Sequence, residues 1–531
     1  MTLGDPRQAA RQAVMHLRRG SRLGAKRLSG LSRRPLMGPV EVVDSFDAWA
    51  YLKQLHEQIS RVLASRGIPH LVLDARVRTH PTIVAAYEDA QAIVAALAED
   101  EGTQQHWVAK SSYGFVGRSR PLSRRPSIGA HTHGLLVARH LVAPNAQRLT
   151  NSEMGVLIDL WHRVGANHPR PDGGTYPEGS LVAPIRSGWL DNIDPDSFAA
   201  AQANNFRLPA GPPSVLQVVE PIDLVYTWVD GSDPAWKARK NEALGITSSG
   251  LSSDAAITAR FESHDELKYS LRSVQMYANW VRKIWIVTDR QVPAWLRTDE
   301  RLAVVDHSEI FADSTALPVF NSHAIESQLH HIPGLSNLYL YLNDDFFFGS
   351  PVRPETFFHG NGVLKFFTSP AVIDIGDDSE RDLAVLSAAK NNRALIARDF
   401  GRTISNKLRH TPQPQSRAVM DEMESRYPEL FDSVMRSRFR SRTDYAIPSS
   451  LSQYYAYARG KAVTGRIHYG YLDLASPDAE MAMEGWLYRR NLECFCVNDS
   501  RDPSPGPGDP VNAKLDEFLD HYFPVKSVWE K

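Results

Sequence analysis

The chain has 531 residues, a formal net charge of −1, 42% hydrophobic residues and 23% charged residues. This length predicts roughly two to four domains, with cores large enough to fold without disulfides. The balanced charge argues against a general attraction to nucleic acid, and no apolar run is long enough to cross a bilayer.

Residues 1–40 form a basic arm in which arginine and lysine are mixed with leucine and acidic residues are almost absent. One interpretation is a disordered tail. The other is a peripheral contact with the anionic inner face of the plasma membrane. A cleaved targeting signal is not expected, because no apolar core follows the basic residues.

Residues 41–210 are expected to form a smaller, mixed α/β accessory domain. The spacing of apolar residues predicts helices over residues 46–63 and 82–97, and a short apolar run predicts a strand over residues 70–73. A loop rich in proline and glycine at residues 208–213 marks the expected boundary. No motif in this part of the chain indicates a chemical function.

Residues 211–531 are expected to form the catalytic domain, because apolar strands here run into acidic turns. The predicted strands cover residues 222–229, 283–288 and 338–342. Helical segments lie between them, which predicts a largely parallel sheet. The carboxyl ends of such strands meet at one edge of the sheet, where these folds bind ligands.

A helix is predicted to begin at Ser263, which together with Glu266 has the pattern of a capping box. Its buried stripe starts with Leu267 and Leu271. Arg272 lies on another face of this helix, where it is either a solvated charge or a substrate ligand.

The sharpest local feature is Asn343-Asp344-Asp345, because two adjacent carboxylates after a buried strand repel each other unless a cation lies between them. Mg²⁺ and Mn²⁺ prefer oxygen ligands and also bind the diphosphate of a nucleotide-sugar. The alternative interpretation is a solvated, aspartate-rich turn.

A second candidate is the turn at residues 230–233. Gly231 lets a ligand approach the backbone closely, and Asp233 is suited to bind a metal or a sugar hydroxyl. The alternative is an Asx-type turn, in which the aspartate side chains bond to their own backbone.

Three further candidates lie in the last quarter of the chain. His410 is a candidate general base, since imidazole titrates near neutrality. Arg440, in a basic run at residues 436–442, has the donor geometry that suits phosphate. Asn498 and Asp499 follow the apolar segment CFCV and repeat the pattern of a strand that ends in an acid. The alternative is a structural or surface role for His410 and a solvated face for Arg440.

Cys494 and Cys496 are the only cysteines, too few for a disulfide framework or a structural zinc site, and a bridge between them is not expected. They indicate a reducing, cytoplasmic setting.

The chain also lacks a Walker A loop, a Rossmann glycine pattern, a His-Glu-x-x-His helix and a nucleophile elbow.

Four blocks of the chain resemble the Stealth family of bacterial sugar-1-phosphate transferases. They are IDLVYTWVDGSD at residues 222–233, a long block at 260–349 that ends in LYLYLNDDFFFG, NKLRHTPQPQ within 406–431, and NLECFCVNDS at 491–500. This family serves capsule and exopolysaccharide synthesis, includes exopolysaccharide phosphotransferases of actinobacteria, and is related to the animal lysosomal-enzyme N-acetylglucosamine-1-phosphotransferase.

The resemblance implies a fold of the glycosyltransferase-A type, with a mostly parallel sheet and helical insertions. It implies transfer of a hexose-1-phosphate or N-acetylhexosamine-1-phosphate from a UDP-sugar to a hydroxyl of a polysaccharide, with Mg²⁺ or Mn²⁺ as cofactor. Nucleic acid is not an expected partner, and the oligomeric state is open. The alternatives are an ordinary glycosyltransferase, which moves sugar without phosphate, and a glycan-binding protein without activity.

The site residues implied by the resemblance come from all four blocks. The catalytic positions are Asp233, Asp344, His410 and Arg440, and the metal ligands are Asp344, Asp345 and Asp499. We expect substrate contacts at Asp230, Gly231, Glu266, Arg272, Asn343 and Asn498. The chain departs from many relatives at Asp230, where they have asparagine, and at Gln413-Pro414-Gln415, where some have a second histidine.

Overall fold

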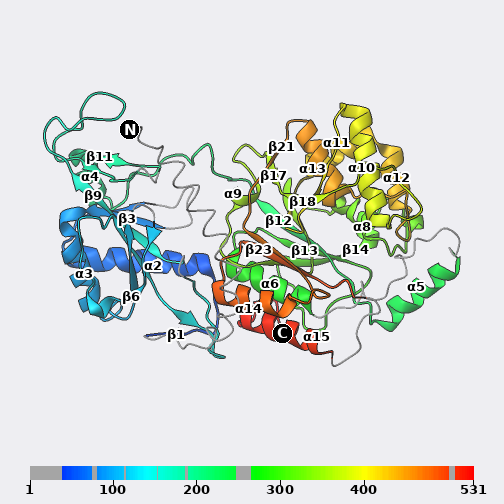
Figure 1. The fold of residues 1–531 in the computed structure, drawn as a ribbon, viewed down its shortest axis with the longest axis horizontal. Coiled ribbons are helices and arrows are strands. Elements are labelled where there is room, and N and C mark those ends of the chain that lie inside the picture. Colours follow the sequence, from blue (N-terminus) through cyan, green and yellow to red (C-terminus); the bar gives the residue numbers. More distant parts are fainter. Residues whose placement is uncertain are drawn as a thin grey trace, which may run out of the picture.

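A computed structural model describes residues 39–73, 81–112, 115–151, 154–185, 189–246, 265–501 and 509–531 (Figure 1). The predicted basic arm therefore lies outside the described residues apart from its last two positions, and so does Ser263. No helix of the described residues is both long enough and apolar enough to cross a membrane.

The N-terminal part, blue and cyan in Figure 1, is a twisted sheet covered by helices α2 (Ala48–Ser65) and α3 (Ala90–Glu99). The predicted helix over residues 46–63 is confirmed with a shift at its ends, because Asp47 caps it by accepting from the backbone N–H groups of Trp49 and Ala50. The predicted strand over residues 70–73 is confirmed as β2 (His70–Leu73).

This sheet runs in the order β11-β10-β9-β7-β4-β5, with β3 between β2 and β9 and with β6 beside β4. The bounds of the strands and of the helix that follows them are β3 (Thr82–Ala86), β4 (Trp107–Ser112), β5 (Phe115–Val116), β6 (Arg120–Pro121), β7 (Gly134–Ala138), β9 (Val156–Arg163), β10 (Leu181–Val182), β11 (Asn192–Ile193) and α4 (Pro195–Ala203). A separate short pair joins β1 (Glu41–Val42) to β8 (Leu141–Val142).

The predicted helix over residues 82–97 is wrong in its first third. Thr82–Ala86 form β3, which pairs with β2 on one side and β9 on the other, and α3 begins only at Ala90. The run Thr82-Ile83-Val84 is β-branched, which favours a strand. Because this strand is buried on both faces, its continuous apolar pattern does not distinguish it from a buried helix.

The C-terminal part is built on a second sheet, in the order β14-β13-β12-β15-β20. The first four strands are parallel and β20 is antiparallel to β15, so the predicted largely parallel sheet is confirmed. Their bounds are β12 (Ile222–Thr227), β13 (Ile284–Thr288), β14 (Leu302–Asp306), β15 (Leu338–Asn343) and β20 (Gln413–Ser416). All three strands predicted from the sequence are present.

Helices cover both faces of this sheet. Leu224 packs on one face with Leu271 of α6 (Glu266–Tyr277), and Val225 packs on the other face with Ala324 of α8 (Ser322–Glu326). This alternation along β12 is the pattern expected of a strand with two buried faces. Both faces of the sheet are therefore covered, and ligands of such sheets bind at the carboxyl edge.

Insertions after β15 complete this part of the molecule. The strands β16 (Phe346–Phe348), β23 (Cys494–Asn498) and β22 (Tyr469–Asp473) form a small sheet, flanked by α14 (Ala479–Arg489) and α15 (Pro510–Tyr522). Helices gather above the main sheet in Figure 1. They are α10 (Ala384–Phe400), α11 (Arg417–Arg426), α12 (Pro428–Met435) and α13 (Ser452–Ala458). Cys494 and Cys496 are buried and free, as predicted.

The remaining elements connect these parts. They are α5 (Pro234–Ile246), α7 (His307–Ile310), α9 (Pro354–Phe357), β17 (Leu364–Phe366), β18 (Thr368–Val372), β19 (Asn406–Leu408) and β21 (Ala462–Thr464).

The N- and C-terminal parts are packed together at the start of α2. The Trp49 indole N–H donates to the Tyr277 carbonyl at 3.0 Å, and Asn279 donates to Asp47 at 2.5 Å. The Arg353 guanidinium lies 4.8 Å from the centre of the Trp49 ring. One hydrophobic cluster runs through both parts. The boundary near residue 210 stays a prediction.

The predicted capping box at Ser263 is wrong in its register. Helix α6 begins at Glu266, and its N-cap is Asp265 in the left-handed conformation, with φ 61°. Aspartate tolerates this conformation better than most residues, and the Asp265 carboxylate pairs with Lys268 at 2.6 Å instead of capping the helix. Glu266 is thus the first residue of the helix and not the third.

Candidate active site

The acid pair lies in the turn between β15 and β16, at the carboxyl edge of the main sheet. Asp344 and Asp345 are half-buried. The backbone N–H of Val497 in β23 donates to the Asp345 carbonyl at 3.2 Å, and the Cys496 thiol donates to Asp345 Oδ2 at 3.3 Å. Strand β23 of the small sheet therefore holds Asp345 in place through these two contacts.

The acid pair carries negative charge that no described protein group compensates fully. Asp345 Oδ1 is buried and has no hydrogen-bond partner among the described residues. Burial, followed by the charge of Asp344, raises the pKa of Asp345 to about 7. Burial, followed by the charge of Glu266, raises the pKa of Asp344 to about 7. An orphaned carboxylate oxygen beside a second carboxylate fits a divalent cation.

Asn498 and Asp499 reach the acid pair through strand pairing. Phe346 pairs with Cys496 in antiparallel register, so the continued register places Asn498 opposite Asp344. The Asn498 side chain donates to Asp473 at 3.3 Å. Both oxygens of Asp499 accept from Arg501, at 2.8 and 2.6 Å. To reach a cation, Asp499 must therefore share or release Arg501.

Glu266 approaches the pair from the start of α6, and the hydroxyl of Ser270 fixes the position of this helix. Ser270 Oγ donates to the Phe346 carbonyl at 2.5 Å and lies 2.8 Å from the Tyr226 hydroxyl. The negative charge of Glu266 raises the pKa of Asp344. The predicted substrate residue Glu266 thus belongs to the same acidic cluster.

His410 lies on the other side of the acid pair. Its ring packs edge-on against Tyr471 and Phe346, with centroid distances of 5.2 and 6.2 Å. Phe346 directly follows Asp345, so the imidazole is next to the turn. Although His410 as a whole is exposed, loss of water around its ring, followed by the positive charge of Lys407, lowers the pKa of His410. The ring is therefore neutral at pH 7 and is able to accept a proton.

The turn after β12 is held by a residue that the sequence did not single out, the buried Gln291. The Gln291 side chain accepts from the Asp230 N–H at 3.0 Å, and it donates to the Asp230 carbonyl and to Asp233, both at 2.9 Å. Asp230 also accepts from the hydroxyl of Ser232, and Asp233 from the N–H of Ala235. The predicted Asx-type turn is therefore present, and its contacts run toward β13.

Arg440 is linked to the end of β15 through a buried carboxyl group. The guanidinium donates to Ser322 Oγ at 2.8 Å. Ser322 and Tyr341 both lie beside Glu326, whose pKa is raised by burial. The Tyr341 hydroxyl in turn donates to Asn343 Oδ1 at 2.8 Å. Glu326, which sequence reasoning also missed, thus connects Arg440 to Asn343.

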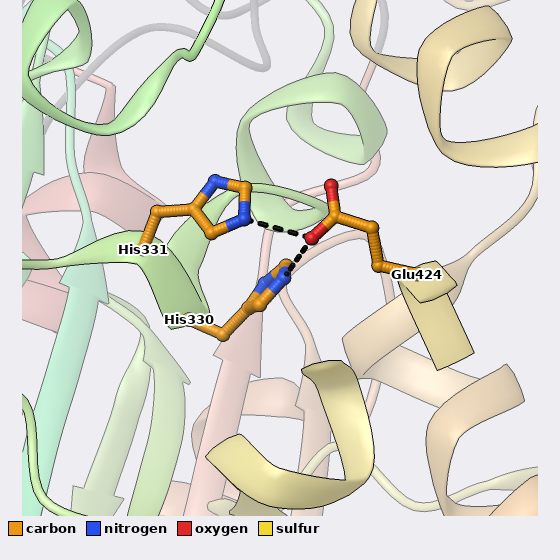
Figure 2. Close-up of side chains that lie close together, drawn as sticks. All are labelled: His330, His331 and Glu424. Atoms are coloured by element: carbon orange, nitrogen blue, oxygen red, sulfur yellow. Dashed lines mark hydrogen bonds and ion pairs between the residues drawn. The ribbon is translucent and has the colours of Figure 1, made fainter. Parts of the chain in front are cut away.

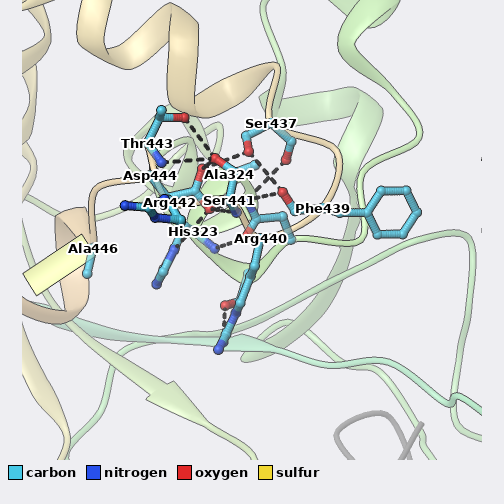
Figure 3. A network of polar contacts seen from close by, with 12 residues as sticks. His323, Ala324, Ser437, Phe439, Arg440, Ser441, Arg442, Thr443, Asp444 and Ala446 are labelled. Atoms are coloured by element: carbon cyan, nitrogen blue, oxygen red, sulfur yellow. Dashed lines mark hydrogen bonds and ion pairs between the residues drawn. The ribbon is translucent and has the colours of Figure 1, made fainter. Parts of the chain in front are cut away.

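The loop that carries Arg440 is pinned by Asp444 (Figure 3). The buried Asp444 carboxylate accepts from Asn321 at 2.8 Å, from the hydroxyl of Ser437 at 2.7 Å and from the N–H of Ser441 at 3.0 Å. These bonds close the loop around one carboxylate, so the direction of Arg440 is set by the fold and not by solvent.

Arg272 is not a solvated charge. Its side chain is buried, pairs with Glu530 through two bonds of 2.8 and 2.7 Å, and donates to the Phe523 carbonyl at 2.9 Å. Because these contacts occupy the guanidinium, Arg272 fastens the C-terminal segment to α6 and is not proposed as a substrate ligand.

Replacing Arg272 with leucine should lower the free energy of unfolding by about 3–5 kcal/mol, the usual cost of leaving one partner of a buried ion pair alone. Urea titration measures this. Lys268→Leu on the same helix is the control, since it removes only a surface pair and should cost less than about 1 kcal/mol. A variant with normal stability but a raised KM for the donor would instead make Arg272 a substrate ligand.

The predicted residues fall into three groups. In the first group, Asn343, Asp344 and Asp345 are consecutive, the strand register places Asn498 opposite Asp344, and His410 packs against Phe346. Glu266 acts on Asp344 through its charge, and Asp499 follows Asn498 in the chain and pairs with Arg501. Asp230, Gly231, Asp233 and Arg440 lie in networks of their own, the first three after β12 and the last beside α8. Arg272 lies apart from both groups.

Four regions of the chain match the conserved regions of the Stealth proteins: region 1 at residues 220–248, region 2 at 260–366, region 3 at 409–457 and region 4 at 486–531. An exopolysaccharide phosphotransferase of Streptomyces coelicolor is 42% identical over 426 residues, which cover 77% of this chain and 71% of that protein. The chain belongs to the Stealth family.

Other relatives carry the same name. The exopolysaccharide phosphotransferase CpsY of Mycobacterium tuberculosis is 40% identical over 320 residues, which cover 60% of each protein. Among solved structures, the galactosyltransferase LgtC aligns at 10% identity and a TM-score of 0.31 over 58% of this chain and 97% of that one, a likeness too low to carry an argument. Every predicted site residue lies within one of the four Stealth regions.

Proposed function

We propose that this Stealth protein transfers a hexose-1-phosphate or N-acetylhexosamine-1-phosphate from a UDP-sugar to a hydroxyl of a growing exopolysaccharide. The observation that carries the proposal is the acid pair, in which Asp345 Oδ1 is buried without a partner among the described residues at the carboxyl edge of the sheet. The names of the relatives support phosphate transfer, and a glycosyltransferase-A fold is the architecture we infer for the C-terminal part.

In this reaction the acceptor oxygen forms a bond to the phosphorus that carries the sugar. The bond from that phosphorus to the oxygen shared with the second phosphate breaks, and UMP leaves with this oxygen. The acceptor hydroxyl loses its proton. A phosphodiester remains between sugar and acceptor.

The chain supplies the groups that such a transfer needs. Asp345, with Asp344, would hold a Mg²⁺ or Mn²⁺ ion, which neutralises charge on the diphosphate when bound. His410 takes the proton of the acceptor hydroxyl, since its lowered pKa keeps it neutral. Arg440, fixed through Asp444, steadies the phosphoryl oxygens.

The remaining predicted residues line the same edge. We assign the turn of Asp230, Gly231 and Asp233 to the nucleotide-sugar, because Gln291 fixes its conformation and Gly231 has no side chain to keep a ligand from the backbone. We assign Glu266, Asn343, Asn498 and Asp499 to hydroxyl groups of the substrates or to the outer ligands of the cation.

The test is the identity of the nucleotide that leaves. The protein is incubated with a panel of UDP-hexoses and UDP-N-acetylhexosamines, with and without Mg²⁺, and with a polysaccharide acceptor. Release of UMP and a phosphodiester signal in the phosphorus NMR spectrum of the product support the proposal. Release of UDP with a product free of phosphorus identifies an ordinary glycosyltransferase. No nucleotide release from any donor identifies a binding protein.

Replacing Arg440 with lysine should lower turnover, because lysine keeps the positive charge but loses the pair of N–H donors that the guanidinium offers to phosphate. The loss should be smaller than about 10²- to 10³-fold, the range for removal of a whole group that stabilises charge in the transition state. Steady-state kinetics with UMP release as readout measures this. Arg436→Lys is the control, since Arg436 pairs with Asp313 and Asp432 at the surface. Unchanged turnover would remove Arg440 from the mechanism.

The basic arm fits a cytoplasmic location at the inner membrane face, where exopolysaccharide precursors would be met. Sedimentation with vesicles tests this. Binding to vesicles with anionic lipid, and none to neutral vesicles, supports the contact, whereas no binding to either supports a disordered tail.

A further inference from the structure

A second cluster of ligand-type side chains lies away from the acid pair. His330 and His331, at the end of the 3₁₀ turn Leu329–His331, converge on Glu424 of α11 (Figure 2). Both imidazole Nε2 atoms lie 2.8 Å from the same oxygen, Glu424 Oε2. One ligand atom from each residue lies within 4.8 Å of the others, the spacing of a metal site.

The hydrogen bonding of His331 shows that this contact needs a positive charge. His331 Nδ1 donates to the Ile310 carbonyl at 3.1 Å, so this nitrogen carries a hydrogen. A neutral His331 then directs the lone pair of Nε2 at Glu424 Oε2, which is also an acceptor. Two acceptors 2.8 Å apart repel each other unless a proton or a metal cation lies between them.

The other two side chains complete the ligand set. The His330 side chain is fully buried, and its Nε2 atom lies 2.8 Å from Glu424 Oε2, the same oxygen that His331 contacts. Asp421 lies one turn earlier on α11.

Two imidazoles and one carboxylate prefer a different cation from the acid pair. Nitrogen ligands favour Zn²⁺ and its neighbours in the transition series, whereas sets of oxygen atoms favour Mg²⁺. The Ile310 carbonyl orients His331 as the outer partners of metal-bound histidines do. Bonds of about 2.0–2.1 Å would require the ligand atoms to move apart slightly from their present 2.8 Å.

The place of the cluster in the fold indicates a structural role. His330 and His331 precede β15, whereas the acid pair follows it, so the six-residue strand separates them by roughly 20 Å at about 3.3 Å a residue. Glu424 lies on the helix that follows β20, the antiparallel neighbour of β15. A cation here would clamp the turn before β15 to α11.

We propose that His330, His331 and Glu424 form a binding site for a transition-metal dication of the Zn²⁺ class, separate from the acid pair. The ion cross-links conserved regions 2 and 3 of the chain at the end of the sheet opposite the acids.

The test is a Zn²⁺ titration of the metal-free full chain by calorimetry, with a large excess of Mg²⁺ present to occupy the acid pair. The expected result is one equivalent of tightly bound Zn²⁺. Glu424→Gln and His331→Gln should each weaken this binding by more than about tenfold. Co²⁺ in place of Zn²⁺ should give a visible absorption band in the wild type and lose it in both variants.

Two controls separate the site from general effects. Glu429→Gln on α12 and His468→Gln remove an exposed acid and an exposed histidine, and both should bind Zn²⁺ like the wild type. Asp345→Asn should also keep the Zn²⁺ equivalent, so failure of this site is distinguishable from failure of the proposed transfer reaction. If Glu424→Gln does not fold, the test rests on His331→Gln. The His331 side chain is 28% exposed, so its replacement should disturb the fold less.

Either of two results would overturn the proposal. One is a wild-type chain that binds Zn²⁺ no more tightly than the variants, which leaves a proton as the only charge between His331 and Glu424. The other is a Zn²⁺ equivalent that survives both substitutions, which places the ion elsewhere.

Discussion

Asp345→Asn should lower turnover of the UDP-sugar by about 10²- to 10³-fold, the range for loss of one group that stabilises charge in the transition state. The substitution keeps the shape of the side chain but removes the charge at the orphaned Oδ1. UMP release at saturating donor measures the rate. The Mg²⁺ concentration for half-maximal activity should rise in the same variant.

The same substitution should leave the metal-free protein as stable as the wild type or more stable. A carboxyl group whose pKa rises from about 3.9 unfolded to about 7 folded makes folding less favourable as the pH increases through this interval. Metal-free wild type should therefore lose stability between pH 4 and 8, and Mg²⁺ should reverse the loss. Asp345→Asn should depend less on pH and on Mg²⁺, as measured by thermal unfolding.

The control for this prediction is Asp478→Asn, which removes an exposed aspartate that makes no side-chain capping bond at the start of α14. It should change neither turnover nor the response to Mg²⁺. If Asp345→Asn keeps the wild-type response to Mg²⁺, Asp345 does not hold the cation.

His410→Gln should lower turnover by about 10²- to 10⁴-fold, the usual contribution of a general base, while KM for the donor changes little. The imidazole packs against Phe346 and Tyr471 beside the acid pair, where an acceptor hydroxyl would lie. Steady-state kinetics with saturating Mg²⁺ separates the two constants. His468→Gln, at an exposed histidine, should behave like the wild type.

The dependence on pH gives a second readout for His410. Only the neutral ring accepts a proton, and loss of water around the ring together with Lys407 lowers its pKa, so turnover should fall on the acid side of about pH 6.5. Lys407→Met removes one of the two causes, so the pKa of His410 should rise and the acid limb should move to higher pH. An acid limb that does not move would separate His410 from the rate-limiting proton transfer.

The strands of the main sheet could be predicted from the sequence because each is a short apolar run that ends in polar residues. The run of residues 338–342 is apolar and ends in Asn343-Asp344-Asp345, and the structure places this run as a central strand with its acids at the carboxyl edge. Parallel strands buried on both faces leave few other interpretations. The prediction was wrong at residues 82–86, because the continuous apolar run of this buried strand also fits a buried helix.

The site was only partly readable, because its supporting contacts join residues far apart in the chain. Asp345 is backed by Cys496, which is 151 residues later, and no local pattern pairs them. Gln291 lies three residues after the predicted strand 283–288, so a search of strand ends that included amides as well as acids would have found it. Arg272 is a further example, since its partner Glu530 is 258 residues away and their buried ion pair excludes the interpretation of a solvated helix charge.

The most direct measurement is the position of Mn²⁺ by anomalous diffraction from crystals grown with Mn²⁺ and a UDP-sugar that is not turned over. We predict a peak at coordination distance from Asp345 Oδ1, with Asp344 as a further ligand and the diphosphate on its open side. A peak bound only by the turn of Asp230 and Asp233, or none near the acids while the donor is bound, would contradict the account.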